Sequence, residues 1–217
     1  MLKKIITPAN ISNEEDTRKE YDLNTLAQKL RKNEFEVEIF PRSEPATNYI
    51  MTRCSKKTVG LGDSYSLWQI GLLERLKKTN DAEWVGDKKD RDTRKKAMTA
   101  NVFILSGNAI AYDTGEIINI DSKGNRISGG LYYPDEIIYV LGKNKIAPNL
   151  EEAIKRAKNI AAPKNSQSHG YRTACAELGY CVNCSNSDRI CRITCILHKK
   201  PKYANITVVL INQELGF

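Results

Sequence analysis

Residues 101–146 decide the fold, and they run NVFILSGNAIAYDTGEIINIDSKGNRISGGLYYPDEIIYVLGKNKI. This is the one long segment in which dense apolar runs alternate with dense turn signals. The continuous apolar runs at 102–105 and 137–141 predict strands that are buried on both faces. Polar turns that contain glycine lie between them, at 106–108, 112–116 and 121–126. Because binding groups usually sit on loops carried by a rigid sheet, these turns indicate a binding site.

A similar turn lies upstream, in the run TVGLGDS at residues 58–64. It predicts a strand, a turn and then an amphipathic helix over 64–79. Glycines let the backbone approach a ligand, and the free amides at a helix start favour a phosphate or a carboxylate. A tight turn capped by Asp63 and Ser64, with no ligand, is the alternative.

The remaining pattern alternates helices with buried strands. We expect a helix over 12–32 with Ser12 as N-cap, a strand over 35–40, a helix over 149–161 that ends before Pro163, and a strand over 205–211. Such alternation predicts an α/β fold with a mostly parallel sheet. The 217 residues suffice for one sizeable core, so we expect a single domain over 1–217, with 1–55 as a helix-and-strand lead-in.

The composition excludes some partners. The net charge is +8, but Lys and Arg are mixed with Asp and Glu, and the aromatic residues are few. This favours a solvated basic surface and no nucleic-acid partner. No apolar run reaches eighteen residues and the first residues do not resemble a signal peptide, so we expect no membrane contact and a cytoplasmic location.

Four of the six cysteines fall in one short segment, with the spacing C-x5-C-x2-C-x6-C: Cys175, Cys181, Cys184 and Cys191. Disulfides are rare in the cytoplasm, so this spacing predicts a metal site. A 4Fe–4S cluster and a tetrahedral zinc ion both fit four thiolates in a tight loop. Four reduced thiols without metal are the alternative. We expect Cys195, and the lone Cys54, to be packed side chains.

The runs SGNAI at 106–110, DTGEIINIDSKGNR at 113–126 and VLGKNKI at 140–146 closely resemble the LUD-domain family of lactate-utilisation proteins, formerly DUF162. The resemblance continues in GLGDS at 60–64 and through the cysteines to LGF at 215–217. It covers roughly residue 56 to the end. The chain departs from the family at Ala111, where relatives commonly carry Thr.

The resemblance implies a three-layer α/β/α fold of the NagB/RpiA/CoA-transferase type, with a cysteine-rich metal-binding loop inserted at 164–198. Ligands in such open sheets bind beyond the carboxyl ends of the strands. The resemblance also implies a component of an iron–sulfur-linked oxidation of L-lactate to pyruvate. Its redox partners, iron–sulfur or flavin proteins, would be other chains.

We therefore expect a small anionic metabolite to be the ligand. The candidate binding residues are Gly60, Gly62, Asp63, Ser64, Ser106, Asn108, Asp121, Gly124, Asn125, Arg126 and Lys145. Arg126 is the best charge partner because its planar fork can donate two hydrogen bonds to a carboxylate. Asp121 is either a general base or a residue that holds its turn, and we favour the turn.

Two other functions stay open. One is a non-catalytic metabolite-binding or regulatory subunit with a structural metal. The other is an acyl- or CoA-transferase, with Glu116 as nucleophile, or a sugar-phosphate isomerase, although fold analogy alone supports neither enzyme. The chain has two histidines, His169 and His198. His169, in the polar segment 164–173, could border a site, but an exposed loop position is favoured. His198 is expected at the surface, and no Ser–His–Asp arrangement is evident.

The cysteine spacing gives a first testable prediction. Protein purified without oxygen should contain about four irons with sulfide and a broad absorbance near ~400 nm, or about one zinc and no colour. The Cys181→Ser/Cys184→Ser variant should lose the metal, because it removes two of the four thiolates. Metal analysis and the visible spectrum measure this. A wild-type protein with neither metal would contradict the prediction.

Overall fold

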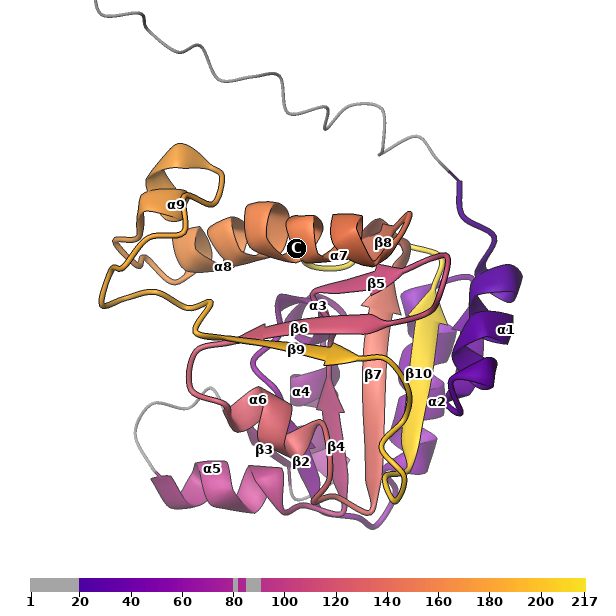
Figure 1. Cartoon of the computed structure of the whole chain (residues 1–217). Coiled ribbons are helices and arrows are strands. Elements are labelled where there is room, and N and C mark those ends of the chain that lie inside the picture. The colour runs from indigo at the N-terminus through magenta and orange to yellow at the C-terminus, as the bar shows by residue number, and fades with distance from the viewer. Residues whose placement is uncertain (1–19, 80–81, 85–90) are drawn as a thin grey trace, which may run out of the picture.

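The computed structural model describes residues 20–79, 82–84 and 91–217, and its centre is a six-stranded sheet. The strands, in spatial order, are β1 (Glu36–Phe40), β10 (Ile206–Ile211), β7 (Glu136–Gly142), β4 (Val102–Leu105), β2 (Val59–Leu61) and β3 (Ala82–Trp84). Every neighbouring pair is parallel. All carboxyl ends therefore meet at one edge, the upper edge in Figure 1.

The apolar runs form the middle of this sheet. Every residue of β4, β7 and β10 is buried. Phe103 of β4 pairs with Ile137 of β7, which in turn pairs with Ile206 of β10. A strand covered on both faces needs apolar side chains in both directions, which is why these segments show continuous runs rather than alternation. The predicted strands at 102–105, 137–141 and 205–211 are confirmed within one residue.

Three helices cover one face of the sheet: α2 (Ser43–Arg53), α3 (Tyr65–Gln69) and α4 (Leu72–Thr79). Their buried side chains, such as Ile50, Leu67 and Leu76, pack with Ile104 and Val140 of the sheet. The sequence predicts one helix over 64–79, but the structure has two. Gly71 interrupts the helix in the left-handed conformation, at φ +65°, which glycine adopts without steric cost.

The other face is covered by α1 (Leu23–Lys32), α5 (Arg91–Met98) and a second sheet. This four-stranded sheet has the order β8 (Ile146–Ala147), β5 (Ala109–Ala111), β6 (Ile117–Asp121) and β9 (Ile193–Leu197). Its strand β6 is antiparallel to both β5 and β9. Figure 1 shows β5 and β6 crossing in front of the upper part of β7. The sequence analysis did not predict this second sheet.

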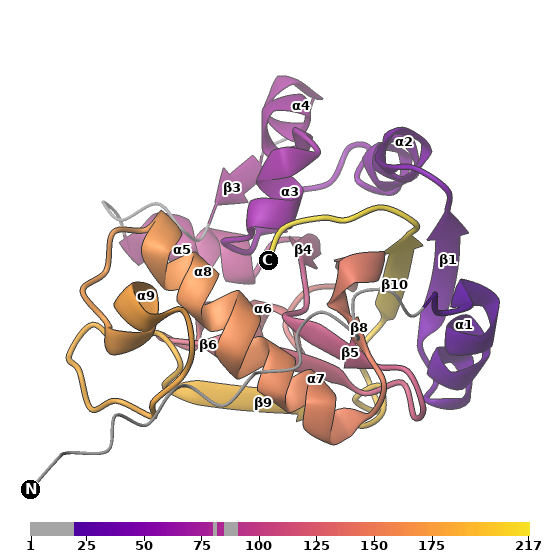
Figure 2. The ribbon, with the colours of Figure 1, turned by 90° about the horizontal axis from the view of Figure 1, so that it is seen from above.

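A long helical rod covers the outer face of the second sheet. It consists of α7 (Leu150–Arg156), a π-helical turn η3 (Ala157–Ala161) and α8 (Ala162–Ser168). Figure 2 shows them as one continuous rod. The predicted helix end before Pro163 is wrong. Proline lacks an N–H, and its ring crowds the carbonyl of the residue four positions before it. For Pro163 that residue is Asn159, which lies within the wider π turn.

The start of the first helix also differs from the prediction. Helix α1 begins at Leu23, where the Asp22 carboxylate accepts from the amides of Asn24 and Thr25 at 3.1 and 3.0 Å. An Asp at this position satisfies amides that have no partner within the helix. The predicted cap Ser12 lies outside the described residues.

The fold thus has three layers, α, β and α, with a mostly parallel sheet in the middle, as expected. The short elements α6 (Asn125–Gly129), η2 (Lys143–Lys145) and α9 (Ala174–Leu178) connect them. In the part of the chain that the structure describes, no helix is both long and apolar enough to span a bilayer.

An ion network at the amino end of the sheet gives a stability prediction. The side chain of Glu136 is 5% exposed and lies 2.7 Å from Arg53 and 3.2 Å from Lys57. Glu136→Gln should lower the free energy of unfolding by about 2 kcal/mol, because charged hydrogen bonds to a buried carboxylate are lost. Urea unfolding measures the change. Glu36→Gln is the matched control, since Glu36 is 62% exposed at the outer end of the same network, and it should cost well under half as much. Equal costs would contradict the prediction.

Candidate functional site

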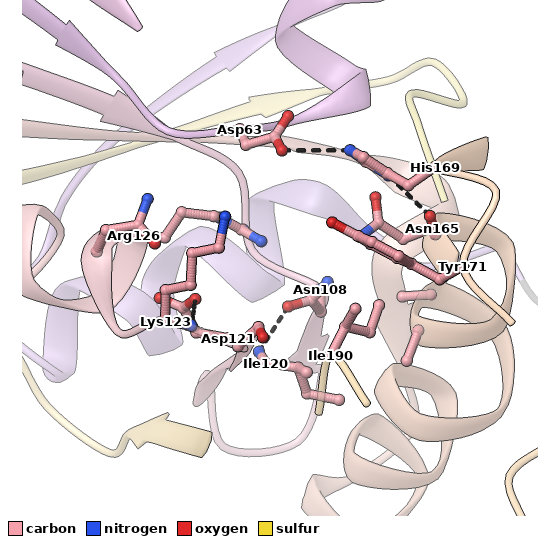
Figure 3. Close-up of a pocket in the computed structure, with 14 residues that line it drawn as sticks. Asp63, Asn108, Ile120, Asp121, Lys123, Arg126, Asn165, His169, Tyr171 and Ile190 are labelled. Atoms are coloured by element: carbon pink, nitrogen blue, oxygen red, sulfur yellow. Dashed lines mark hydrogen bonds and ion pairs between the residues drawn. The ribbon is translucent and has the colours of Figure 1, made fainter. Parts of the chain in front are cut away.

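A pocket opens at the carboxyl edge of the main sheet, below the helical rod. Its walls come from the turn after β2, the turn after β4, the β6–α6 segment, the end of α8 and the cysteine-rich segment. The lining residues are Asp63, Asn108, Ile120, Asp121, Ser122, Lys123, Asn125, Arg126, Ala161, Ala162, Asn165, His169, Tyr171 and Ile190. Figure 3 shows Arg126 and Lys123 on one side and His169, Asn165 and Tyr171 on the other.

The turn after β4 is held by three basic side chains. Its successive carbonyls at Ser106, Gly107 and Asn108 accept hydrogen bonds from Arg126 at 2.6 Å, Lys145 at 3.0 Å and Arg156 at 2.5 Å, respectively. The three donors come from α6, η2 and α7. Hydrogen bonds from charged donors are roughly twice as strong as neutral ones. The turn at the floor of the pocket is therefore fixed by three separate elements.

Lys145 lies behind this floor and is 4% exposed. Its amine is bonded to the hydroxyls of Ser106 at 2.7 Å and Ser66 at 2.9 Å. Within the described ranges, no ion pair joins Lys145 or Arg126 to a carboxylate. Burial, followed by the guanidinium groups of Arg156 and Arg126, holds the pKa of Lys145 well below its usual range. Lys145 thus supports the pocket floor and does not line the pocket.

Arg126 does line the pocket, and it keeps unused bonding capacity there. One terminal nitrogen donates to the Ser106 carbonyl and lies 3.4 Å from Oδ1 of Asn119, which is itself held by Tyr139. Its Nε is buried and has no hydrogen-bond partner. A buried donor without a partner costs free energy. An acceptor on a bound ligand would remove that cost.

Asp121 serves the turn, as the sequence analysis favoured. Its two carboxylate oxygens accept from the amides of Lys123 and Ile127, each at 3.1 Å. Gly124 lies in the left-handed conformation, at φ +82°, and caps α6. These bonds direct the Lys123 and Arg126 side chains to the same wall (Figure 3). That wall carries two cations, and the carboxylate beside them, Asp121, already accepts hydrogen bonds from two backbone amides.

The opposite wall contains a residue that the sequence analysis placed in an exposed loop. His169 ends helix α8, and its Nε2 lies 3.3 Å from Oδ2 of Asp63. Its Nδ1 lies 2.9 Å from the carbonyl oxygen of Asn165, and its ring stacks on Tyr171 at a 5.6 Å centroid distance. The error follows from the helix: because α8 continues beyond Pro163, His169 reaches the pocket. No pattern in the sequence marks this continuation.

The structure divides the predicted ligand residues into two groups. Five line the pocket: Asp63, Asn108, Asp121, Asn125 and Arg126. The others lie around or behind it: Gly60, Gly62, Ser64, Ser106, Gly124 and Lys145. Gly60 lies within β2, where a Cβ would meet the Ala97 carbonyl and the Phe103 ring. The amide of Gly62 donates to Ile104 at 2.8 Å, so it is not free for a ligand.

The predicted metal ligands also separate into two groups. Cys175 is buried and lies 3.3 Å from the Thr173 hydroxyl. Arg189 donates to the backbone carbonyls of Cys191 and Cys184 at 3.1 and 2.7 Å, and its pKa is raised, most strongly by its interaction with Cys191. Among the described residues, no three His, Cys, Asp or Glu side chains are arranged to hold a metal ion. The four-cysteine metal site therefore stays a prediction from the sequence.

The two remaining cysteines are packed. Cys195 lies in β9 and is partly buried against the main core. Cys54 is fully buried, and burial raises its pKa to about 12, which keeps it a neutral thiol.

The open parallel sheet, with its pocket at the carboxyl edge, defines an α/β domain of the three-layer class. The LUD domain model matches residues 23–211. The chain therefore belongs to the LUD-domain family, as the sequence resemblance predicts.

A crystal structure of a DUF162 family protein from Deinococcus radiodurans is similar in fold. It is 12% identical, has a TM-score of 0.53 and covers 87% of this chain and 95% of its own. No curated protein matches the chain.

Lys145 gives a prediction for the dependence of stability on pH. Its folded pKa is depressed below the ordinary value of 10.5, so between the two values the unfolded chain binds one more proton. Stability should therefore rise with pH towards about 10.5, by up to about 1.4 kcal/mol per pH unit. In Lys145→Met this contribution should disappear.

Urea unfolding from pH 7 to pH 10 measures the slope for each protein. Lys143→Met is the control, because Lys143 lies in the same short helix but is exposed. It should keep the wild-type slope. Identical slopes for wild type and Lys145→Met would show that Lys145 titrates normally in the folded protein.

Proposed function

We propose that the pocket binds a small carboxylate metabolite that bears a hydroxyl or oxo group beside the carboxylate. The observation that carries this proposal is Arg126: its half-buried side chain lines the pocket, has no carboxylate partner among the described residues, and keeps a buried Nε without an acceptor. A carboxylate can accept two parallel hydrogen bonds from such a fork. Lys123 adds a second positive charge on the same side.

The polarity of the pocket supports a ligand with two different ends. The wall with Lys123 and Arg126 is cationic, whereas the opposite wall carries the Asp63–His169 pair. A carboxylate would lie at the cationic wall. An oxygen on the adjacent carbon would then face groups that both donate and accept hydrogen bonds. Two- to four-carbon 2-hydroxy and 2-oxo carboxylates have this arrangement.

Membership of the LUD-domain family supports a role for this ligand in lactate utilisation. In our proposal, the chain is the metabolite-binding component of an oxidation of L-lactate or a similar acid in the cytoplasm. The electrons would pass to an iron–sulfur or flavin protein on another chain. A metal in the cysteine-rich segment belongs to the same expectation, but the described thiols do not form a ligand set, so no step is assigned to it.

A binding subunit without catalysis is the second candidate, and the same pocket supports it. Acyl transfer through Glu116 has less support. Glu116 lies in the turn before β6, where it pairs with His198 at 3.5 Å and with the Thr114 hydroxyl. It is not among the residues that line the pocket.

The proposal predicts how Arg126 affects ligand binding. L-Lactate and pyruvate should raise the melting temperature, because a ligand that binds only the folded state stabilises it. Arg126→Gln should weaken their binding by roughly 10- to 100-fold, the equivalent of one or two charged hydrogen bonds. Arg126→Lys should recover only part of the affinity, since the ammonium lacks the planar fork. Calorimetric titration and thermal shift measure both effects.

Two controls accompany this experiment. Lactamide has the shape of lactate without its negative charge, and it should not bind. Arg75→Gln removes an arginine of α4 that bonds Asn48 away from the pocket, and it should bind like wild type. Wild-type affinity in Arg126→Gln, or equal binding of lactamide, would contradict the proposal.

A further inference from the structure

The Asp63–His169 pair is the one place in the described pocket where a titratable imidazole faces a carboxylate. Asp63 belongs to the turn after β2 and His169 to the end of α8, so the pair joins segments that are far apart in sequence. Figure 3 shows both side chains at the pocket, with the dashed contact between them. The His169 side chain is 28% exposed and that of Asp63 37%. The pair is thus accessible to a small ligand.

The surroundings of His169 assign different roles to its two nitrogens. Nδ1 lies 2.9 Å from the Asn165 carbonyl oxygen, which can only accept a hydrogen bond. Nδ1 also lies 3.2 Å from the Ser168 hydroxyl, which can donate or accept. In the tautomer that donates from Nδ1 to the Asn165 carbonyl, Nε2 is the basic nitrogen of the neutral ring. Nε2 lies 3.3 Å from the Asp63 carboxylate. Once Nε2 takes up a proton, that carboxylate balances the charge of the imidazolium.

Stacking on Tyr171 further fixes the ring, since the two planes differ by 5°. A base, a group that fixes its tautomer and a counter-charge are the parts of a general acid–base centre. The cationic wall with Arg126 and Lys123 lies opposite this centre (Figure 3). A ligand held by its carboxylate would present its next carbons to Nε2.

We propose that His169, assisted by Asp63, catalyses proton transfer at the carbon next to the carbonyl of a 2-oxo carboxylate. The inference rests on the proposed function, because it needs the carboxylate to be held by Arg126. Nε2 of His169 takes the C3 proton, and the electron pair of the broken C–H bond forms the C2–C3 double bond of the enolate. The enolate oxygen gains the negative charge, which the imidazolium formed on His169 in the same step offsets.

The reverse step returns a proton from His169 to C3. Atoms and electrons balance in each direction, and no further reactant is required. In heavy water the proton that returns is a deuteron, so the reaction replaces C3 protons of the substrate with deuterium although it produces no other chemical change.

The test is the exchange of carbon-bound protons in heavy water. Pyruvate and 2-oxobutyrate are incubated with the full chain, and proton NMR follows the loss of the C3–H signals. Wild type should exchange them at least tenfold faster than the buffer alone. His169→Gln should lose most of this enhancement and approach the buffer rate, because a general base typically contributes roughly 10²-fold or more. Its affinity for both acids should fall far less than its exchange rate, because Arg126 and Lys123 still hold the carboxylate.

His198→Gln is the matched control. His198 is the other histidine, and it also lies near a carboxylate, Glu116, but it is 67% exposed and does not line the pocket. This variant should exchange and bind like wild type. Asp63→Asn keeps the shape of the side chain and removes the counter-charge, so it should lower the exchange rate without abolishing it.

The outcomes separate this inference from the proposed function. Binding without exchange in wild type overturns the acid–base role and leaves the binding function intact. Exchange that persists in His169→Gln overturns the assignment of the base. Failure of wild type to bind either acid overturns the proposed function, and the proton-transfer inference with it. Exchange that is lost only in His169→Gln and reduced in Asp63→Asn supports it.

Discussion

Three consecutive carbonyl groups, at Ser106, Gly107 and Asn108, each accept a hydrogen bond from a different basic side chain. The site depends on this arrangement. Peptide carbonyls carry only partial charges, so they compensate the charges of Arg126 and Arg156 incompletely. The contacts that hold the pocket floor therefore leave positive charge that a bound anion would balance, as the proposed function requires.

The two walls of the pocket differ: the wall with Arg126 is held by hydrogen bonds to the backbone, whereas the wall with Asp63 and His169 can gain or lose a proton. The cationic wall is built from short elements joined to the sheet, and its Arg126 is held by the Ser106 carbonyl. The Asp63–His169 wall is built from two side chains that meet across a 3.3 Å contact and remain partly exposed. Such a division suits a site that holds one end of a ligand and moves a proton at the other, because holding requires preorganisation and proton transfer requires an exchangeable site.

Much of the architecture could be predicted from the sequence, because continuous apolar runs such as those at 102–105 and 137–141 have few other uses than buried parallel strands. The turns that end them supplied Asp63, Asn108, Asp121, Asn125 and Arg126. The second sheet could not be predicted. Its strands are two to five residues long, as at Ile146–Ala147, which is too short for a strand pattern to be recognised in the sequence. His169 was misplaced because Pro163 normally ends a helix, and a local rule cannot show that tertiary packing keeps the helix intact. Ser66 and Arg156 carry no sequence signal for their role, which exists only through their long-range contacts.

The π-helical turn at Ala157–Ala161 determines in which direction the side chains of α8, which follows it, point. A π turn contains about one residue more than an α turn, and each residue in a helix rotates the next by about 100°. Arg156, before the turn, faces the main sheet, whereas Asn165 and His169, after it, face the pocket. A chain with one residue fewer here would keep its helix and its fold, yet present a different face of α8 to the ligand. In such a scaffold, a single insertion or deletion in the helix can bring other side chains to the pocket without any substitution in α8.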